Sequence, residues 1–129
     1  GWSAGWGLFE KGEAPLVISY TTSPAATLEY NGATDYEALI FDEGHSIQVE
    51  GAAILKNAPN PEGAKKFMDF LISEEAQNVL PLTQWMYPAN KNVVLPESYR
   101  KAAPIPQKTV SADPAKLEEA VTKVMEILQ

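Results

Sequence analysis

The 129-residue sequence contains no cysteine and only one histidine, His45. Disulfides, thiolate metal sites and a cysteine nucleophile are therefore excluded. A metal site that this chain builds from two or more histidines is excluded as well. The sequence has no phosphate-binding loop and no nucleophile elbow. No apolar run approaches the roughly eighteen residues that a membrane-crossing helix needs.

Basic residues are scarce, because Lys and Arg total 10 against 17 Asp and Glu, which gives a net charge of −7. A pI near 4.6 argues against nucleic-acid binding, which normally requires a basic surface, and against recruitment to anionic lipid. The charge is uneven, since residues 1–58 carry a net −6. This half of the chain either attracts a cationic ligand over long range or presents an acidic surface that maintains solubility.

Apolar residues make up 45% of the chain, enough for an ordinary globular core. Their spacing and the Gly, Pro and Ser signals between them predict an alternation of strands and helices, and hence an α/β fold. We expect strands over residues 15–20, 36–41 and 46–55. We expect helices over residues 2–11, 25–30, 61–72, 74–81 and 97–101, and from 114 to the end.

Start and stop signals and apolar faces accompany several of these helices. Gly12 and Asn31-Gly32 are expected to end the first two helices, Asn60-Pro61 to begin the helix over 61–72, and Ser73 to cap the next one. Ser23 is expected to cap the second helix, with Pro24 at its first position. The last helix is expected to bury one apolar face against the rest of the protein. That face contains Leu117, Ala120, Val121, Val124, Ile127 and Leu128.

A catalytic interpretation finds little support. His45 and Ser46 are adjacent, and neighbouring side chains of a strand point to opposite faces, so they do not form a base–nucleophile pair. Glu43 and His45 lie two residues apart, which suits a surface or hinge hydrogen bond. We therefore predict that the chain is not an enzyme and has no catalytic or metal-ligating residues.

Aromatic residues give a stronger indication. Trp2, Trp6, Tyr20, Trp85 and Tyr87 lie at or next to the ends of the expected elements, and Trp85 and Tyr87 share one face of an extended segment. The face of a tryptophan attracts a planar cation by roughly 0.5–2 kcal/mol. Packing in the core is the alternative for these rings.

Residues 19–24, with the sequence Ser-Tyr-Thr-Thr-Ser-Pro, are the second candidate. They place hydroxyl side chains at the expected start of a helix, where free backbone N–H groups suit an anion. Simple capping by Ser23 is the alternative.

Together these runs resemble the periplasmic thiamine-binding proteins of bacterial ABC importers. The resemblance rests on Trp2, on Gly-Leu-Phe-Glu-Lys-Gly-Glu-Ala at 7–14, on residues 19–25, on Glu-Gly-His at 43–45, on Gln-Val-Glu at 48–50 and on Trp-Met-Tyr-Pro at 85–88. The region from Asn60 to Gln77 resembles a segment that solute-binding proteins share more widely. The resemblance covers nearly the whole chain and weakens after about Val93.

The resemblance implies that the chain is the C-terminal portion of a two-lobed type II periplasmic binding protein, without its N-terminal portion. Residues 1–45 would belong to the second lobe, residues 46–90 would return to the first lobe, and residues 91–129 would form a tail whose helix packs toward the second lobe. Unpaired strand edges would then be exposed. We expect the isolated chain to form a dimer or domain swap, or to associate with the missing portion.

The implied function is capture of thiamine or a thiamine phosphate in a cleft that closes by hinge motion, followed by delivery to the ABC permease in the membrane. The location would be periplasmic or otherwise extracytoplasmic, with the protein secreted or membrane-anchored. Thiamine is the ligand rather than a cofactor, and no cofactor is expected. The ligand-binding residues implied by the family are Trp2, Tyr20, Thr21, Thr22, Ser23, Pro24 and Trp85.

Two positions depart from the family pattern. Ala26 stands where members often have a tyrosine that stacks on the ligand, and Ser46 stands where an aromatic residue often follows the histidine. Tyr30 or Tyr36 would be able to compensate.

Other functions remain open at this point. The same fold also binds polyamines and other organic cations, for which acids and aromatics are equally suitable. Ferric-iron binders commonly use two adjacent tyrosines, a motif absent here because Tyr20 lies between Ser19 and Thr21. An enzyme completed by the missing portion and a non-binding structural fragment are the alternatives from other classes.

Overall fold

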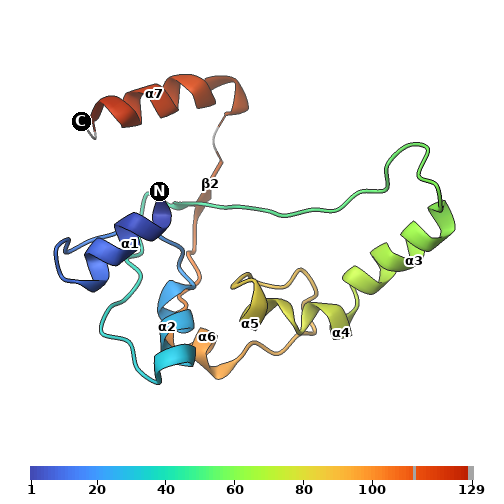
Figure 1. Cartoon of the computed structure of the whole chain (residues 1–129), viewed down its shortest axis with the longest axis horizontal. Coiled ribbons are helices and arrows are strands. Elements are labelled where there is room, and N and C mark those ends of the chain that lie inside the picture. The colour runs from blue at the N-terminus through green and yellow to red at the C-terminus, as the bar shows by residue number, and fades with distance from the viewer. Residues whose placement is uncertain (112, 128–129) are drawn as a thin grey trace. The chain divides into compact units, whose positions relative to one another are not determined.

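The computed structural model of the chain describes residues 1–111 and 113–127 (Figure 1). Internal contacts divide it into two units. The first comprises Gly1–Leu39 and Ala52–Ile105, and the second comprises Ile40–Gly51 and the described residues of Pro106–Gln129. Because these units are defined by contacts within this chain, the predicted assignment of 1–45, 46–90 and 91–129 to lobes stays a prediction.

The first two helices end at the predicted signals. Helix α1 spans Trp2–Glu10 and α2 spans Ser23–Asn31. Gly12 (φ 74°) and Gly32 (φ 75°) follow them, and their N–H groups donate to Phe9 O and Leu28 O. Glycine adopts this left-handed conformation without the steric penalty of a Cβ atom.

The three predicted strands are wrong in extent. Of residues 15–20, 36–41 and 46–55, only Ser46 lies in a strand, β1 (His45–Ser46), which pairs in parallel with β2 (Thr109–Val110) in the second unit. The remaining residues belong to no helix or strand, and Ile18 and Val49 are 87% and 80% exposed. A strand requires a neighbour for its N–H and C=O groups, and apart from Ser46 these segments have no paired strand in the described part of the chain.

The middle of the chain forms three helices in succession, α3 (Pro61–Leu71), α4 (Glu74–Gln77) and α5 (Leu80–Thr83). The side chain of Asn60 caps α3, and that of Ser73 caps α4, as the sequence predicts. The expected single helix over 74–81 is wrong, because α4 ends at Gln77 and α5 begins at Leu80 with Pro81 in its first turn. Proline is tolerated in a first turn, where its missing N–H leaves no hydrogen bond unmade.

The small core of the first unit forms where α2 packs against α6 (Glu97–Ala102), and Figure 1 shows the two helices side by side. Ala25, Tyr99 and Ala103 are buried there, and the rings of Trp85 and Tyr87 pack against them. The Tyr99 hydroxyl donates to Pro81 O at 2.7 Å. Burial, with a smaller contribution from Tyr87, raises the pKa of Tyr99, so this hydroxyl keeps its proton at neutral pH.

The Gln77 side chain joins two parts of the first unit through three hydrogen bonds. Its Oε1 atom accepts from Ala89 N at 2.7 Å and Asn90 N at 3.2 Å, and its Nε2 atom donates to Leu71 O at 2.8 Å. The residue is buried. Because buried backbone groups must be paired, this amide fixes the segment that leads out of the Trp85–Pro88 run.

Replacing Gln77 by leucine is expected to lower the free energy of unfolding by about 2–4 kcal/mol, because two backbone N–H groups and one carbonyl lose their partner. Urea unfolding followed by circular dichroism measures the change. The matched control is Gln84→Leu at an exposed position, where a change within about 0.5 kcal/mol is expected. Equal effects of the two substitutions would contradict the role given to the Gln77 amide.

The C-terminal helix forms as predicted but does not bury its apolar face. Helix α7 (Leu117–Ile127) follows a 3₁₀ turn (Pro114–Lys116) that the Asp113 side chain caps. Val121, Val124 and Ile127 are exposed, Ile127 to 81%, and Leu128 lies outside the described residues. The buried-face prediction is wrong for the structure described, because an amphipathic stripe is buried only when another element covers it. Of the helices described, none has the length and hydrophobicity to cross a bilayer.

Candidate ligand-binding site

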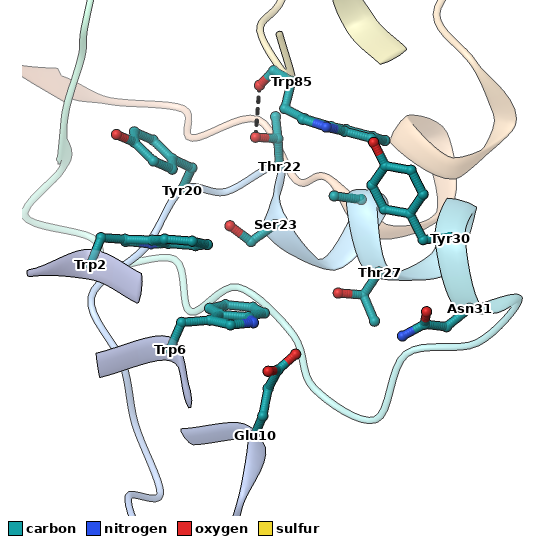
Figure 2. Close-up of a pocket in the computed structure, with 11 residues that line it drawn as sticks. Trp2, Trp6, Glu10, Tyr20, Thr22, Ser23, Thr27, Tyr30, Asn31 and Trp85 are labelled. Atoms are coloured by element: carbon teal, nitrogen blue, oxygen red, sulfur yellow. Dashed lines mark hydrogen bonds between the residues drawn. The ribbon is translucent and has the colours of Figure 1, made fainter. Parts of the chain in front are cut away.

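A pocket of about 380 Å³ lies in the first unit, between α1, α2 and Trp85 (Figure 2). This volume suits a small organic molecule. Five of the eleven lining residues are aromatic. The lining residues are Trp2, Trp6, Glu10, Tyr20, Thr22, Ser23, Ala26, Thr27, Tyr30, Asn31 and Trp85.

Helix α1 supplies one wall as a pair of stacked indoles. Trp2 and Trp6 are four residues apart, so they lie on one helix face, and their rings stack at 5.2 Å with planes 17° apart. Trp2 Nε1 donates to Ser19 Oγ at 3.0 Å, and Ser19 Oγ is 2.7 Å from Ser23 Oγ. This chain of hydrogen bonds fixes the orientation of the Trp2 ring, although the residue is 50% exposed.

Trp85 supplies the opposite wall. Its ring lies parallel to that of Tyr99 at 6.2 Å and meets the edge of Tyr30 at 5.4 Å. Thr22 Oγ1 donates to Trp85 O at 2.9 Å, as Figure 2 shows. Trp85 has φ 54°, a conformation that costs a non-glycine residue about 1–3 kcal/mol. The core contacts and the Thr22 bond therefore hold the indole at the pocket against local backbone preference.

Tyr30, and not Tyr36, lies in the pocket beside Ala26. Tyr36 packs edge-on against Trp6 and Phe9, and its hydroxyl is hydrogen-bonded to Thr27. Burial raises the pKa of Tyr36, the Thr27 bond lowers it, and the nearby Glu10 carboxylate raises it. Of the two tyrosines named above as compensating for Ala26, the structure therefore places Tyr30 at the site.

Five of the seven predicted binding residues line this pocket. They are Trp2, Tyr20, Thr22, Ser23 and Trp85. Thr21 does not line it, and Pro24 is buried and faces a second pocket on the other side of α2. That these residues bind a ligand stays a prediction.

The N-terminus of α2 differs from the predicted anion site. Thr22, not Ser23, is the residue that precedes the helix, and neither side chain caps it. The N–H of Ser23 donates to Tyr20 O and that of Ala26 to Thr22 O, while Pro24 has no N–H to give. Ser23 forms a hydrogen bond with Ser19 instead, so this helix start offers side-chain hydroxyls, and two of its first backbone N–H groups are already paired.

Sequence reasoning named Ser23 as a binding residue and Tyr30 as able to compensate for Ala26, but it missed Thr27, Asn31 and the continuous pocket face of α2. Its pocket residues are Ser23, Ala26, Thr27, Tyr30 and Asn31. They follow the i, i+3, i+4, i+7, i+8 spacing of one helix face, a signal that was available once the helix was placed. Glu10, at the end of α1, was missed as well.

Tyr87 and His45 have structural contacts elsewhere. Tyr87 packs edge-on against Tyr99 and donates its hydroxyl to Ala103 O at 3.0 Å, so it belongs to the core rather than to the pocket. His45 Nε2 accepts from Phe41 N at 2.8 Å. Over residues 1–111 and 113–127, no group of three or more His, Cys, Asp or Glu side chains is placed to hold a metal.

An aromatic pocket on this scaffold is typical of a protein that captures a small solute, and comparison with known proteins identifies the class. The chain belongs to the bacterial extracellular solute-binding protein family, whose profile matches residues 1–78. This confirms the family resemblance. It also supports the prediction of a binding protein rather than an enzyme.

Individual relatives include proteins of two descriptions. The chain is 44% identical over 117 residues to the thiamine-binding periplasmic protein of Escherichia coli, covering 91% of this chain and 35% of that protein. The protein of the same description from Salmonella typhimurium is 46% identical over 103 residues, covering 80% and 31%. A major ferric iron-binding protein of Neisseria meningitidis is 36% identical over 85 residues, covering 66% and 26%.

A solved structure of a periplasmic thiamin binding protein matches with a TM-score of 0.75 and 41% identity, covering 98% of this chain and 39% of that one. The match confirms the predicted fold class, an α/β chain that forms part of a periplasmic-binding-protein fold. The chain spans about a third of the length of the curated relatives it matches.

Proposed function

We propose that this chain forms one part of the thiamine-binding site of an extracytoplasmic solute-binding protein that serves an ABC importer. The observation that carries the proposal is the pocket in which Trp2, Trp6 and Trp85 present their rings to one space with a single carboxylate. The names of the relatives supply the ligand.

Thiamine fits this chemistry. Its cationic thiazolium is attracted to the face of an indole by roughly 0.5–2 kcal/mol, and its flat aminopyrimidine suits stacking between aromatic side chains. The hydroxyethyl arm is matched by the hydroxyls of Ser23 and Tyr20, which line the same pocket. Thr21 and Pro24, which the family resemblance adds to the site, would act from the turn that carries these residues.

The exposed walls of the pocket support capture between two lobes. Trp2 and Tyr30 are 50% and 72% exposed, and large aromatic surfaces left in water generally mark an interaction site. The longer relatives contain a portion that this chain does not match. We propose that an equivalent portion covers Trp2 and Tyr30 when a hinge closes. Delivery to the membrane permease follows from the same proposal.

Apolar side chains that are exposed outside the pocket indicate how the chain behaves on its own. Ile18, Val49 and Ile127 are largely exposed, and the extended segments around the first two are unpaired among the described residues. We propose that the 129-residue chain on its own associates with a second copy or with a portion equivalent to the part of its longer relatives that it does not match. Light scattering of the chain, with and without that portion added, measures this.

The central experiment is a calorimetric titration of the full-length protein with thiamine and its phosphates, with tryptophan fluorescence followed in parallel. All three tryptophans lie in the pocket, so binding is expected to change the emission as well as to release heat. A polyamine is the comparison ligand. Binding of the polyamine in preference to thiamine, or of neither, would overturn the proposed ligand.

A further inference from the structure

Glu10 is the one charged residue among the described residues that line the aromatic pocket. Figure 2 shows its carboxylate directed toward the space bounded by Trp6 and Thr27. In the described structure the salt bridges are Lys65–Glu62, Lys101–Glu97 and Lys123–Glu119. Glu10 therefore faces the pocket without a salt bridge among the described residues, and its neighbour Lys11, the cap residue of α1, does not line the pocket.

The position of Glu10 is unfavourable for the helix that carries it. Glu10 is the last residue of α1, and no basic residue lies in that last turn. The C-terminal end of a helix carries a partial negative charge, which repels a carboxylate. A positive group from outside the chain would relieve this repulsion.

A second helix end adds to the same field. Asn31, the last residue of α2, also lines the pocket, so the C-terminal ends of α1 and α2 both lie along its wall. No lysine or arginine lines the pocket among the described residues. This side of the pocket is thus electronegative, while the indole faces beside it are attractive to a cation.

We propose that Glu10 is a specificity-determining residue that recognises the positive charge of the ligand and disfavours neutral or anionic forms. The inference rests on the proposed function and deepens it. It predicts that this part of the site prefers thiamine both to an uncharged analogue and to the thiamine phosphates, whose added negative charge faces the carboxylate.

The test measures the affinity of the full-length protein for three ligands by calorimetry. They are thiamine, thiamine monophosphate, and the thiamine analogue in which a neutral thiophene replaces the thiazolium ring. The variants are Glu10→Gln, which keeps the size and removes the charge, and Glu13→Gln, which removes an exposed charge that lines neither pocket.

Glu10→Gln is expected to weaken thiamine binding roughly tenfold, the size of one charge-assisted contact. It should leave the affinity for the neutral analogue unchanged and should narrow the preference for thiamine over its monophosphate. Glu13→Gln should alter none of these affinities by more than about twofold. Rising salt should weaken thiamine binding more in the wild type than in Glu10→Gln, because salt screens the attraction. The thermal midpoint of Glu10→Gln should not fall, because the charge is unfavourable to α1.

Two results separate the inference from the function on which it rests. If the wild type binds thiamine and Glu10→Gln binds it equally well, the inference is overturned and the proposed function stands. If the wild type binds no form of thiamine, the proposed function fails. In that case the affinities for the N-methylnicotinamide cation and for neutral nicotinamide are compared. The inference survives only if the wild type prefers the cation and the Glu10→Gln variant does not.

Discussion

Replacing Tyr99 by alanine is expected to lower the free energy of unfolding by about 3–5 kcal/mol, enough to remove much of the stability of an ordinary domain. Tyr99 is 1% exposed and joins Trp85, Tyr87 and Pro81 in one contact group. Few other residues are buried in this unit, so nothing nearby can refill the space. Chemical unfolding of the full-length protein measures the effect.

One further variant separates the contribution of the Tyr99 hydroxyl from that of its ring, and another serves as a control. Tyr99→Phe keeps the ring and removes the hydrogen bond to Pro81 O, so a loss of about 1–2 kcal/mol is expected. Tyr20→Ala removes a tyrosine that is 63% exposed and should change stability by about 0.5 kcal/mol or less. A Tyr99→Ala loss no larger than that of Tyr20→Ala would show that the core does not depend on this ring.

The raised pKa of Tyr99 leads us to expect that stability depends on pH in the alkaline range. Its pKa in the folded protein is raised above the ordinary value of 10.0, by burial first and by Tyr87 second. Above pH 10 the unfolded chain loses this proton while the folded chain keeps it, so stability falls as the pH rises. Below that pH the residue has no effect on the pH profile. Tyr99→Phe should show a shallower alkaline loss than the wild type.

Replacing Trp2 by alanine is expected to weaken thiamine binding by roughly tenfold to a hundredfold, because the pocket loses an aromatic face that is already oriented. Trp2 is half exposed and lies on one short helix, so stability should change far less than affinity. Calorimetric titration of the full-length protein measures the loss.

Two further variants test the role of Trp2, one with a smaller expected loss of affinity and one as a control. Ser19→Ala removes the hydrogen bond from Trp2 Nε1 and keeps the ring, so a smaller loss of roughly twofold to fivefold is expected, about 0.4–1 kcal/mol. Leu8→Ala removes an exposed apolar side chain of the same helix outside the pocket and should leave binding unchanged. Equal losses in Trp2→Ala and Leu8→Ala would point to damage to α1 rather than to a binding role.

Local signals predicted the helices well. The positions of Gly12, Gly32, Asn60 and Ser73 depend on the backbone conformation and side chains of a few neighbouring residues, and the structure places each at the expected helix end. One wall of the pocket was also accessible from local pattern, because Trp2 and Trp6 share one face of a predicted helix.

Burial and strand pairing were predicted poorly, because both depend on what lies opposite. The β-branched run at 15–20 favours a strand, yet Ile18 has no neighbouring strand among the described residues and is exposed. The stripe on α7 is amphipathic, yet Val121 and Val124 are uncovered. A pattern in one segment specifies which face is apolar and leaves open what covers it.

The sequence by itself determined the absence of thiol and multi-histidine chemistry, the helix ends, and the aromatic and hydroxyl residues from which a cation-binding surface can be made. The tertiary structure decided which of them meet. It brought Trp85 to Thr22 across sixty-three positions of the chain, chose Tyr30 over Tyr36 for the pocket, took Tyr87 into the core and placed the Glu10 carboxylate beside the indoles. The physical reason is that composition and spacing fix the chemistry of each element, whereas contacts between distant residues fix their distances. Those contacts are the packing of α2 against α6 around Tyr99 and the contacts of α1 with Ser19 and Tyr36.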